Sequence, residues 1–284
     1  IESEINATNA QNIFINGKAG TGKSTLLKIF KDHTSKNVVV LAPTGIAALN
    51  ILGQTIHSFF KFHITVTPDN LGFINQEKDS VYNTVDTIII DEVSMVRADM
   101  IDIIDKYLRR ARKEMDVPFG GTQMIFIGDP FQLPPIVLSK DEQMFYLQYT
   151  SPYFFHSKVY PSMFIETINL THIFRQKDIT FIKALNAIRE NNVTDEDLDI
   201  INSRHNVGYD EKYHYIYITT TNDRVTKIND EKLSSIKNKL YSTKAYVFGN
   251  FEKKYFPTDE VLNFKKSAQV MLLVNNKEGL YVNG

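Results

Sequence analysis

Residues 12–24 read Asn-Ile-Phe-Ile-Asn-Gly-Lys-Ala-Gly-Thr-Gly-Lys-Ser, an apolar run followed by a glycine-rich segment. The segment that begins at Gly17 matches the pattern G-x-x-x-x-G-K-[ST], in which backbone N–H groups surround a phosphate at the start of a helix. The pattern requires a strand before it and a helix after it. Residues 12–16 are apolar enough for the strand, and residues 23–33 are rich in Leu and Lys, as a helix requires. The sequence therefore predicts a P-loop nucleotide-binding fold.

Phosphate binding is expected along this whole segment. Lys23 is expected to reach the β- and γ-phosphates of ATP, and the hydroxyl of Ser24 is expected to bind Mg²⁺. The residues predicted to bind the nucleotide are Gly17, Ala19, Gly20, Thr21, Gly22, Lys23, Ser24, Thr25 and, from a later strand, Asp91.

The first half of the chain alternates apolar runs with helical patterns. Further strands are expected at residues 38–42, 85–90 and 122–127, with helices at 23–33, near 45–52 and at 95–112. Short, continuous apolar runs are typical of strands buried on both faces of a parallel sheet. This pattern predicts an α/β protein. Apolar runs at 164–170 and 214–219 begin a second α/β region, and strands are expected from residue 241 to residue 274.

Two acidic residues end the expected strand at 85–90. Open α/β sheets bind ligands at the carboxyl ends of their strands, so Asp91 and Glu92 are placed to act on the nucleotide. Asp91 would hold magnesium, usually through water. Glu92 would polarise the water that attacks the γ-phosphate, which favours hydrolysis over transfer to a substrate hydroxyl.

The next strand leads into Gly-Asp-Pro-Phe-Gln-Leu-Pro-Pro at residues 128–135. The Gln132 amide at this strand end suits a sensor of the γ-phosphate, and the two prolines stiffen the loop after it. In isolation, Asp129 and Gln132 are also compatible with simple capping of a turn.

Several motifs in order resemble the Pif/RecD-like branch of superfamily 1 DNA helicases. They are residues 17–25, Leu-Ala-Pro-Thr-Gly-Ile-Ala-Ala at 41–48 with Thr-Ile-His-Ser-Phe at 55–59, Asp-Glu-Val-Ser-Met at 91–95, and residues 128–135. Leu-Thr-His-Ile-Phe-Arg-Gln at 170–176 is similar to the family motif whose arginine reaches the γ-phosphate from the second lobe. The resemblance implies two RecA-like lobes, ATP hydrolysis, 5′-to-3′ translocation on single-stranded DNA, and catalytic roles for Lys23, Glu92, Gln132 and Arg175.

The resemblance also implies DNA contacts at Pro43, Thr44, Gly45, His57, Ser58 and Phe59 in the first lobe and at Thr220, Thr221 and Asn222 in the second. Short hydroxyl and amide side chains suit releasable phosphate contacts, and the ring of Phe59 or Phe60 suits stacking on a base. The alternative is that Phe59, Phe60 and Phe62 belong to the core.

The expected boundaries follow from the same resemblance. Residues 1–167 form the first lobe, with a wedge-like insert at about 61–84, and residues 168–284 form a second lobe that is incomplete at its C-terminus. The family's barrel-like insert and its last motif are absent from these 284 residues, and no adenine-reading glutamine segment is evident before Asn12.

Composition limits the other possibilities. With 32 Lys and Arg against 33 Asp and Glu, the net charge is -1, so a nucleic acid would have to be held by a local groove. The absence of cysteine excludes disulfides and thiolate zinc sites. There is no secretory signal and no run of 18 apolar residues. We expect a soluble, monomeric intracellular protein that binds single-stranded, duplex or fork DNA. It would be cytoplasmic if bacterial or phage, and nuclear or mitochondrial if eukaryotic.

Two alternatives to an active helicase stay open on the sequence alone. One is a P-loop phosphotransferase or a nucleotide-gated switch without motor activity. The other is a helicase fragment that binds nucleotide or DNA and does not unwind.

Overall fold

The computed structural model describes residues 11–63, 65–72, 74, 80–203, 205, 208, 215–248, 256 and 258–273. The chain divides into two compact units, Ile1–Ser203 and Arg204–Gly284. Each unit is described by itself.

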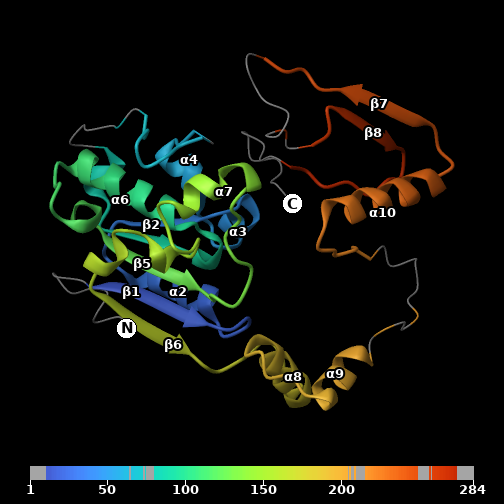
Figure 1. Cartoon of the computed structure of the whole chain (residues 1–284), viewed down its shortest axis with the longest axis horizontal. Coiled ribbons are helices and arrows are strands. Elements are labelled where there is room, and N and C mark those ends of the chain that lie inside the picture. The colour runs from blue at the N-terminus through green and yellow to red at the C-terminus, as the bar shows by residue number, and fades with distance from the viewer. Residues whose placement is uncertain are drawn as a thin grey trace. The chain divides into compact units, whose positions relative to one another are not determined.

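The first unit is organised around a parallel sheet, which has six strands in the described part of the chain (Figure 1). The strands are β1 (Asn12–Gly17), β2 (Val38–Ala42), β3 (Gln54–Thr55), β4 (Thr87–Ile90), β5 (Gln123–Gly128) and β6 (Ile165–Leu170). Their order is β3-β2-β4-β5-β1-β6, and every neighbouring pair is parallel. Every residue of β4 and β5 is buried, which explains their continuous apolar sequences. The predicted α/β fold is confirmed.

Helices cover both faces of this sheet (Figure 1). They are α2 (Lys23–His33), α3 (Gly45–Asn50), α4 (Ile56–Phe60), α5 (Val81–Thr84) and α6 (Ala98–Arg112). Alternate strand residues enter two cores. Phe14 and Ile88 pack with Ile104 of α6, whereas Ile13 and Ile89 pack in the core that includes α2. This alternation follows from the two-residue period of a strand.

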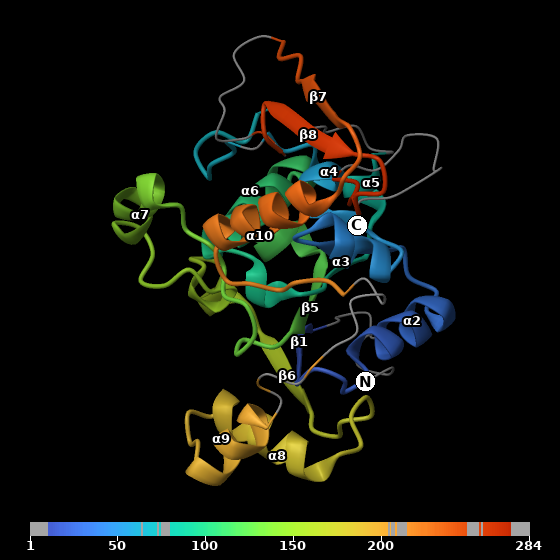
Figure 2. The same cartoon turned by 90° about the vertical axis from the view of Figure 1, so that its right-hand side faces the viewer.

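The remaining helices of the first unit are α7 (Ser139–Tyr146), α8 (Ile179–Arg189) and α9 (Asp195–Asn202). Helices α8 and α9 pack against each other (Figure 2). A capping box precedes α9: the Thr194 hydroxyl accepts from the Asp197 N–H, and the Asp197 carboxylate accepts from the Thr194 N–H. The expected boundary after residue 167 runs through β6, which pairs with β1 along its whole length, and the compact units divide after Ser203 instead.

The second unit contains α10 (Asn222–Ser235) and the antiparallel pair β7 (Leu240–Lys244) and β8 (Val261–Lys265). The Lys265 ammonium donates to the Ile236 carbonyl, which joins β8 to the segment after α10. The strand expected at residues 214–219 is not formed among the described residues, and Ile218 there is 94% exposed. An apolar run becomes a strand only with a partner to accept its backbone hydrogen bonds.

No helix in the described ranges is both long and apolar enough to span a membrane.

Candidate nucleotide-binding site

The predicted nucleotide-binding residues lie at one edge of the parallel sheet. In the strand register, Gly17 is opposite Leu170, and Asn16 is opposite Gly128. Because the strands are parallel, the segments that leave β1, β4, β5 and β6 all start from the carboxyl edge. The phosphate loop, the two acids, the Gln132 loop and the segment of Arg175 therefore begin side by side.

The phosphate loop is a tight turn into α2. The Thr21 hydroxyl donates to the Lys18 carbonyl at 2.9 Å, and Gly22 is the N-cap of α2 with a φ of 88°. Gly20 has a φ of 80°, in the left-handed region that an L side chain rarely adopts. Ala19, Ser24 and Thr25 are exposed, with Ser24 in the first turn of the helix. The first turn of a helix presents free N–H groups, which suit an anion.

Lys23 is folded back into the loop. Its ammonium donates to the carbonyls of Gly17 at 2.7 Å and Lys18 at 3.1 Å, and the residue is only 9% exposed. Burial lowers the pKa of Lys23, while the charges of Glu92, then Asp129 and Asp91, raise it in part. The lysine is therefore desolvated among carboxylates, an arrangement in which a phosphate group would be a strong partner.

Asp91 and Glu92 follow β4 directly. The Asp91 carboxylate accepts from the Glu92 N–H at 2.9 Å, and burial raises the pKa of Asp91. Glu92 has a φ of 50°, a left-handed conformation that costs a non-glycine residue about 1–3 kcal/mol. The turn therefore gives the two adjacent carboxylates different environments, one buried and one partly exposed.

A hydroxyl and a carboxylate are the donors that the sequence predicts for magnesium. Ser24 and Asp91 offer oxygen atoms only, as Mg²⁺ prefers, and Mg²⁺ keeps several of its waters. Within the described ranges, no group of three or more His, Cys, Asp or Glu side chains is arranged as a metal site. The donor set thus fits a metal held by few protein ligands and by the phosphates of a nucleotide.

Gln132 is held by the turn after β5. Its backbone N–H donates to the Asp129 carbonyl at 2.9 Å, and its side-chain amide donates to the Asp129 carboxylate at 3.3 Å. Asp129 is nearly fully buried and also accepts from the Phe131 N–H at 3.1 Å. The Gln132 amide, which is the predicted γ-phosphate sensor, is therefore also the group that caps this turn through Asp129.

Arg189 is a partner of this turn that sequence reasoning missed. Its guanidinium donates to the Asp129 carboxylate at 2.8 Å and lies 4.2 Å from the centre of the Phe131 ring. The pair is 60 residues apart in sequence, so no local pattern indicates it. The only sequence signal is a basic residue at the end of a helix, which is common.

Arg175 lies beside the phosphate loop. The Phe174 N–H donates to the Gly20 carbonyl at 2.8 Å, and a Cβ placed on Gly20 would lie 2.6 Å from the Cβ of Arg175. The positive charge of Arg175 acts on Lys23, whose pKa it lowers slightly beside the larger effect of burial. The structure therefore brings Glu92 and Arg175 within electrostatic range of Lys23, and the Gln132 amide is hydrogen-bonded to Asp129.

The predicted DNA-contact residues of the first unit follow two neighbouring strands. Ala42 of β2 is opposite Thr55 of β3, so residues 43–45 and 57–58 leave adjacent strand ends. The Thr44 hydroxyl accepts from the Ala47 N–H, and thus caps α3 while it remains exposed. His57 and Ser58 are exposed in α4, and Pro43 and Gly45 are half-buried.

Phe59 is a core residue, which corrects the expectation that it offers a ring to a base. It is 7% exposed and packs edge-on against Phe60 and Tyr82. The Tyr82 hydroxyl donates to the Phe59 carbonyl at 2.9 Å. Phe60 and Phe62 are buried in the same cluster. Base stacking needs an accessible ring face, and these rings are packed against each other in the core.

Thr220, Thr221 and Asn222 lie in the second unit. Thr221 is the N-cap of α10, Asn222 is its first residue, and all three are exposed. They occupy the start of a helix, where hydroxyls and N–H groups can meet a phosphate.

The expected wedge-like insert is only partly within the described residues, because 64, 73 and 75–79 fall outside them. Its described part is anchored on α6: the Lys106 ammonium donates to the Pro68 carbonyl at 3.2 Å, and Leu71 is buried. Beside it is a hollow of about 390 Å³ bordered by Phe60, Leu71, Tyr82 and Tyr107, among others.

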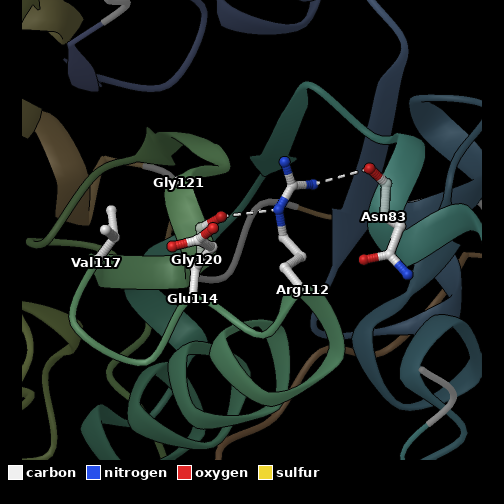
Figure 3. Close-up of a pocket in the computed structure, with 6 residues that line it drawn as sticks. All are labelled: Asn83, Arg112, Glu114, Val117, Gly120 and Gly121. Atoms are coloured by element: carbon white, nitrogen blue, oxygen red, sulfur yellow. Dashed lines mark hydrogen bonds between the residues drawn. The ribbon is translucent and has the colours of Figure 1, made fainter. Parts of the chain in front are cut away.

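A second hollow, of about 380 Å³, lies at the opposite edge of the sheet (Figure 3). The Arg112 guanidinium at its wall donates to the carbonyls of Gly120 at 2.7 Å and Asn83 at 3.4 Å, and also to those of Tyr82 and Val85. The arginine thus ties together the segments before β4 and β5. These bonds use the Nε and Nη1 atoms of Arg112, which gives the arginine a structural role at this hollow.

Comparison with known proteins identifies the family. A family model described as PIF1-like helicase matches residues 1–199. The chain belongs to the PIF1-like helicase family. It is 34% identical to the ATP-dependent DNA helicase RRM3 of Saccharomyces cerevisiae over 96% of its length, and 32% identical to human PIF1 over 93%. It spans 39% and 41% of those two relatives, and 62% of the 30% identical Pif1 of Bdellovibrio bacteriovorus.

Solved PIF1-like structures agree with this membership. The crystal structure of Bacteroides Pif1 bound to ssDNA is 36% identical, with a TM-score of 0.84, over 96% of this chain and 64% of that one. The Bacteroides Pif1 in complex with ADP-AlF3 and ssDNA is 36% identical, with a TM-score of 0.80, over 97% of this chain and 65% of that one. The resemblance drawn from the sequence motifs is therefore confirmed at the level of family and fold.

Proposed function

We propose that this chain provides the ATP-hydrolysing part of a 5′-to-3′ DNA translocase and helicase. One observation carries the proposal: the phosphate loop, the acids after β4, the Gln132 turn and the segment of Arg175 leave one edge of the sheet, and Gly20 contacts the Arg175 segment directly. The names of the relatives support it, because they are ATP-dependent DNA helicases.

In the proposed mechanism, the Lys23 ammonium leaves the carbonyls of Gly17 and Lys18 and binds the β- and γ-phosphates. Glu92 orients the attacking water and takes up its proton. Arg175 and Gln132 contact the γ-phosphoryl oxygens as their charge grows. Ser24 and Asp91 would hold Mg²⁺, which neutralises phosphate charge when it is bound.

DNA is proposed to run along Pro43, Thr44, Gly45, His57 and Ser58, with Thr220, Thr221 and Asn222 as the counterpart in the second unit. Movement requires that the grip on DNA depends on the nucleotide state. Loss of the γ-phosphate removes the shared partner of Gln132 and Arg175, so these two groups are the proposed origin of that dependence. We propose a monomer that acts on single-stranded and forked DNA, in the cytoplasm, nucleus or mitochondrion according to its source.

The test is ATP turnover with and without a single-stranded oligonucleotide. We expect the oligonucleotide to raise turnover severalfold, and Lys23→Ala to lower it by about 100-fold or more. Lys28→Ala is the matched control, since Lys28 is an exposed lysine of the same helix. Unchanged turnover in Lys23→Ala would reject the site. ATP turnover that is the same with and without the oligonucleotide would favour a nucleotide-gated switch. Transfer of phosphate to an added hydroxyl compound would indicate a phosphotransferase.

Unwinding is tested separately with forked duplexes that carry a single-stranded tail at the 5′ or the 3′ end. Strand separation only with the 5′ tail supports the proposed polarity. ATP turnover without strand separation would identify a chain that binds and hydrolyses but does not unwind.

A further inference from the structure

The last turn of α8 contacts two separate parts of the nucleotide site. The Lys18 ammonium in the phosphate loop donates to the Asn186 side chain at 2.7 Å and lies 3.4 Å from the Glu190 carboxylate. One residue before that glutamate, Arg189 pairs with Asp129 in the turn after β5 at 2.8 Å. Arg189 and Glu190 follow Asn186 by three and four residues, so both lie on the same side of the helix as Asn186. This side bridges the phosphate loop and the Gln132 turn.

Arg189 is fixed more firmly than a surface arginine. The Asp129 side chain is 3% exposed and that of Arg189 is 19% exposed. The guanidinium plane also covers the Phe131 ring at 4.2 Å. Arginine presents a planar, permanently charged fork that can bind a carboxylate and a ring together, which lysine cannot reproduce.

The same carboxylate holds Gln132. Arg189 donates to Oδ1 of Asp129, and the Gln132 amide donates to Oδ2. The Phe131 N–H donates to Oδ1 as well. The orientation of the carboxylate therefore sets the direction of the Gln132 side chain, and Arg189 is the charged group that donates a hydrogen bond to the carboxylate.

Helix α8 also begins just after Arg175. The Gln176 side chain accepts from the N–H groups of Lys177 and Asp178, and Asp178 caps the helix by accepting from the Phe181 N–H at 3.0 Å. The connection from Arg175 to Ile179 is therefore short and internally bonded. A helix held at its far end by Arg189 restrains this connection too.

We propose that Arg189 is a positioning residue for ATP hydrolysis, which acts through Asp129 on Gln132 and through α8 on the segment of Arg175. The proposal rests on the proposed function. Arg189 is not a catalytic residue in this account, because its contacts are with Asp129 and Phe131. Its loss would leave the phosphate loop intact and misdirect the groups that meet the γ-phosphate.

The test is steady-state ATP hydrolysis by the full chain with single-stranded DNA. For Arg189→Gln we expect kcat to fall by about tenfold or more, with KM for ATP changed by less than about threefold, because a small misplacement at the reacting centre affects the rate most. Arg189→Lys should recover part of kcat. Lys183→Gln, at an exposed lysine of the same helix, is the matched control and should match the wild type.

A double-mutant cycle decides whether Arg189 acts through Gln132. In a Gln132→Ala background, Arg189→Gln should lower kcat by less than about twofold, because the group that it positions is gone. ADP affinity measured by calorimetry should match the wild type in both variants, which shows that they fold and retain the phosphate loop. The proposal would be overturned if Arg189→Gln lowered kcat by the same factor in the Gln132→Ala background as in the wild type. It would also be overturned if Arg189→Gln raised KM for ATP and left kcat unchanged.

The two failures are distinguishable. A wild-type chain without DNA-stimulated turnover rejects the proposed function. If the wild type is active and Arg189→Gln has the same kcat as Lys183→Gln, the positioning role of Arg189 is rejected and the proposed function stands.

Discussion

The backbone N–H of Phe174 donates to the carbonyl oxygen of Gly20 at 2.8 Å, and this bond joins the phosphate loop to the residue before Arg175. The two residues lie in the segments that follow β1 and β6, which are neighbouring strands in the sheet. An arginine that resembles a trans-domain residue in sequence is thus held next to the phosphate loop within one compact unit. In the proposed mechanism, the approach of Arg175 to a γ-phosphate depends on this short segment.

Gly20→Ala should weaken ATP binding. Alanine at a φ of 80° costs about 1–2 kcal/mol, and its Cβ would lie 2.6 Å from that of Arg175. A cost of this size in the bound loop corresponds to about a tenfold loss of affinity. Titration calorimetry with ATP measures it. Gly208→Ala, where an added Cβ meets no atom within 4 Å, is the control, and equal affinities in both variants would contradict the prediction.

Glu92→Gln should abolish turnover and preserve nucleotide binding. The amide has nearly the same size but cannot accept the proton of the attacking water, so we expect turnover to fall by about 10²–10⁴-fold. ATP affinity and the single-turnover hydrolysis rate are the measurements. Glu114→Gln, at an exposed glutamate, is the control. If hydrolysis survives in Glu92→Gln, another group activates the water.

Asp129 should make stability depend on pH in the acid range. Burial raises the pKa of Asp129, but hydrogen bonds from Arg189, the Phe131 N–H and Gln132 outweigh it and leave the pKa below 3.8. Because the folded pKa is below the unfolded value, the ionised carboxylate stabilises the folded protein above pH 3.8. That contribution is lost as the pH falls through the folded pKa.

Urea unfolding of wild type and Asp129→Asn tests this dependence. We expect the wild type to be more stable by about 3 kcal/mol, since the variant leaves the partly buried Arg189 without its counter-charge. The difference should be constant from about pH 8 to about pH 5 and should shrink below about pH 4. Asp32→Asn, at an exposed aspartate, should show neither effect. A pH-independent difference would mean that Asp129 stabilises by shape alone.

Asp102→Ala should destabilise the first unit, although the hydrogen-bond partners of Asp102 in the described part of the chain are not residues of the candidate nucleotide-binding site. The buried Asp102 carboxylate accepts from the Tyr149 hydroxyl at 2.8 Å and from the N–H groups of Lys158 and Val159, each at 3.0 Å. Its removal leaves three donors unpaired, so we expect the free energy of unfolding to fall by about 3 kcal/mol or more. Urea denaturation measures this, with Asp116→Ala at an exposed aspartate as the control. A loss under about 1 kcal/mol would show that water replaces the carboxylate.

Candidate site residues could be predicted from the sequence where a motif consists of neighbouring residues. The P-loop pattern at Gly17 needs only a few adjacent positions, and so do the acids at Asp91 and Glu92. Their backbone geometry follows from glycine and strand-end preferences. The continuous apolar runs of β4 and β5 likewise predicted a parallel sheet buried on both faces.

Other features needed the three-dimensional arrangement. Phe59 in sequence is compatible with stacking on DNA or with the core, and only the presence of Phe60 and Tyr82 around it decides for the core. The run at 214–219 has strand composition, yet whether it pairs depends on a neighbouring strand.

By itself, the sequence predicted a phosphate-binding loop after β1 and placed the chain among parallel α/β proteins, because both depend on short-range patterns. Only the tertiary structure decided that Arg189 meets Asp129 and that Lys18 meets Asn186, pairs separated by 60 and 168 residues. Such pairs depend on the strand order, which brings the ends of β1, β5 and β6 together, and on the direction in which α8 leaves that edge. No local pattern encodes either.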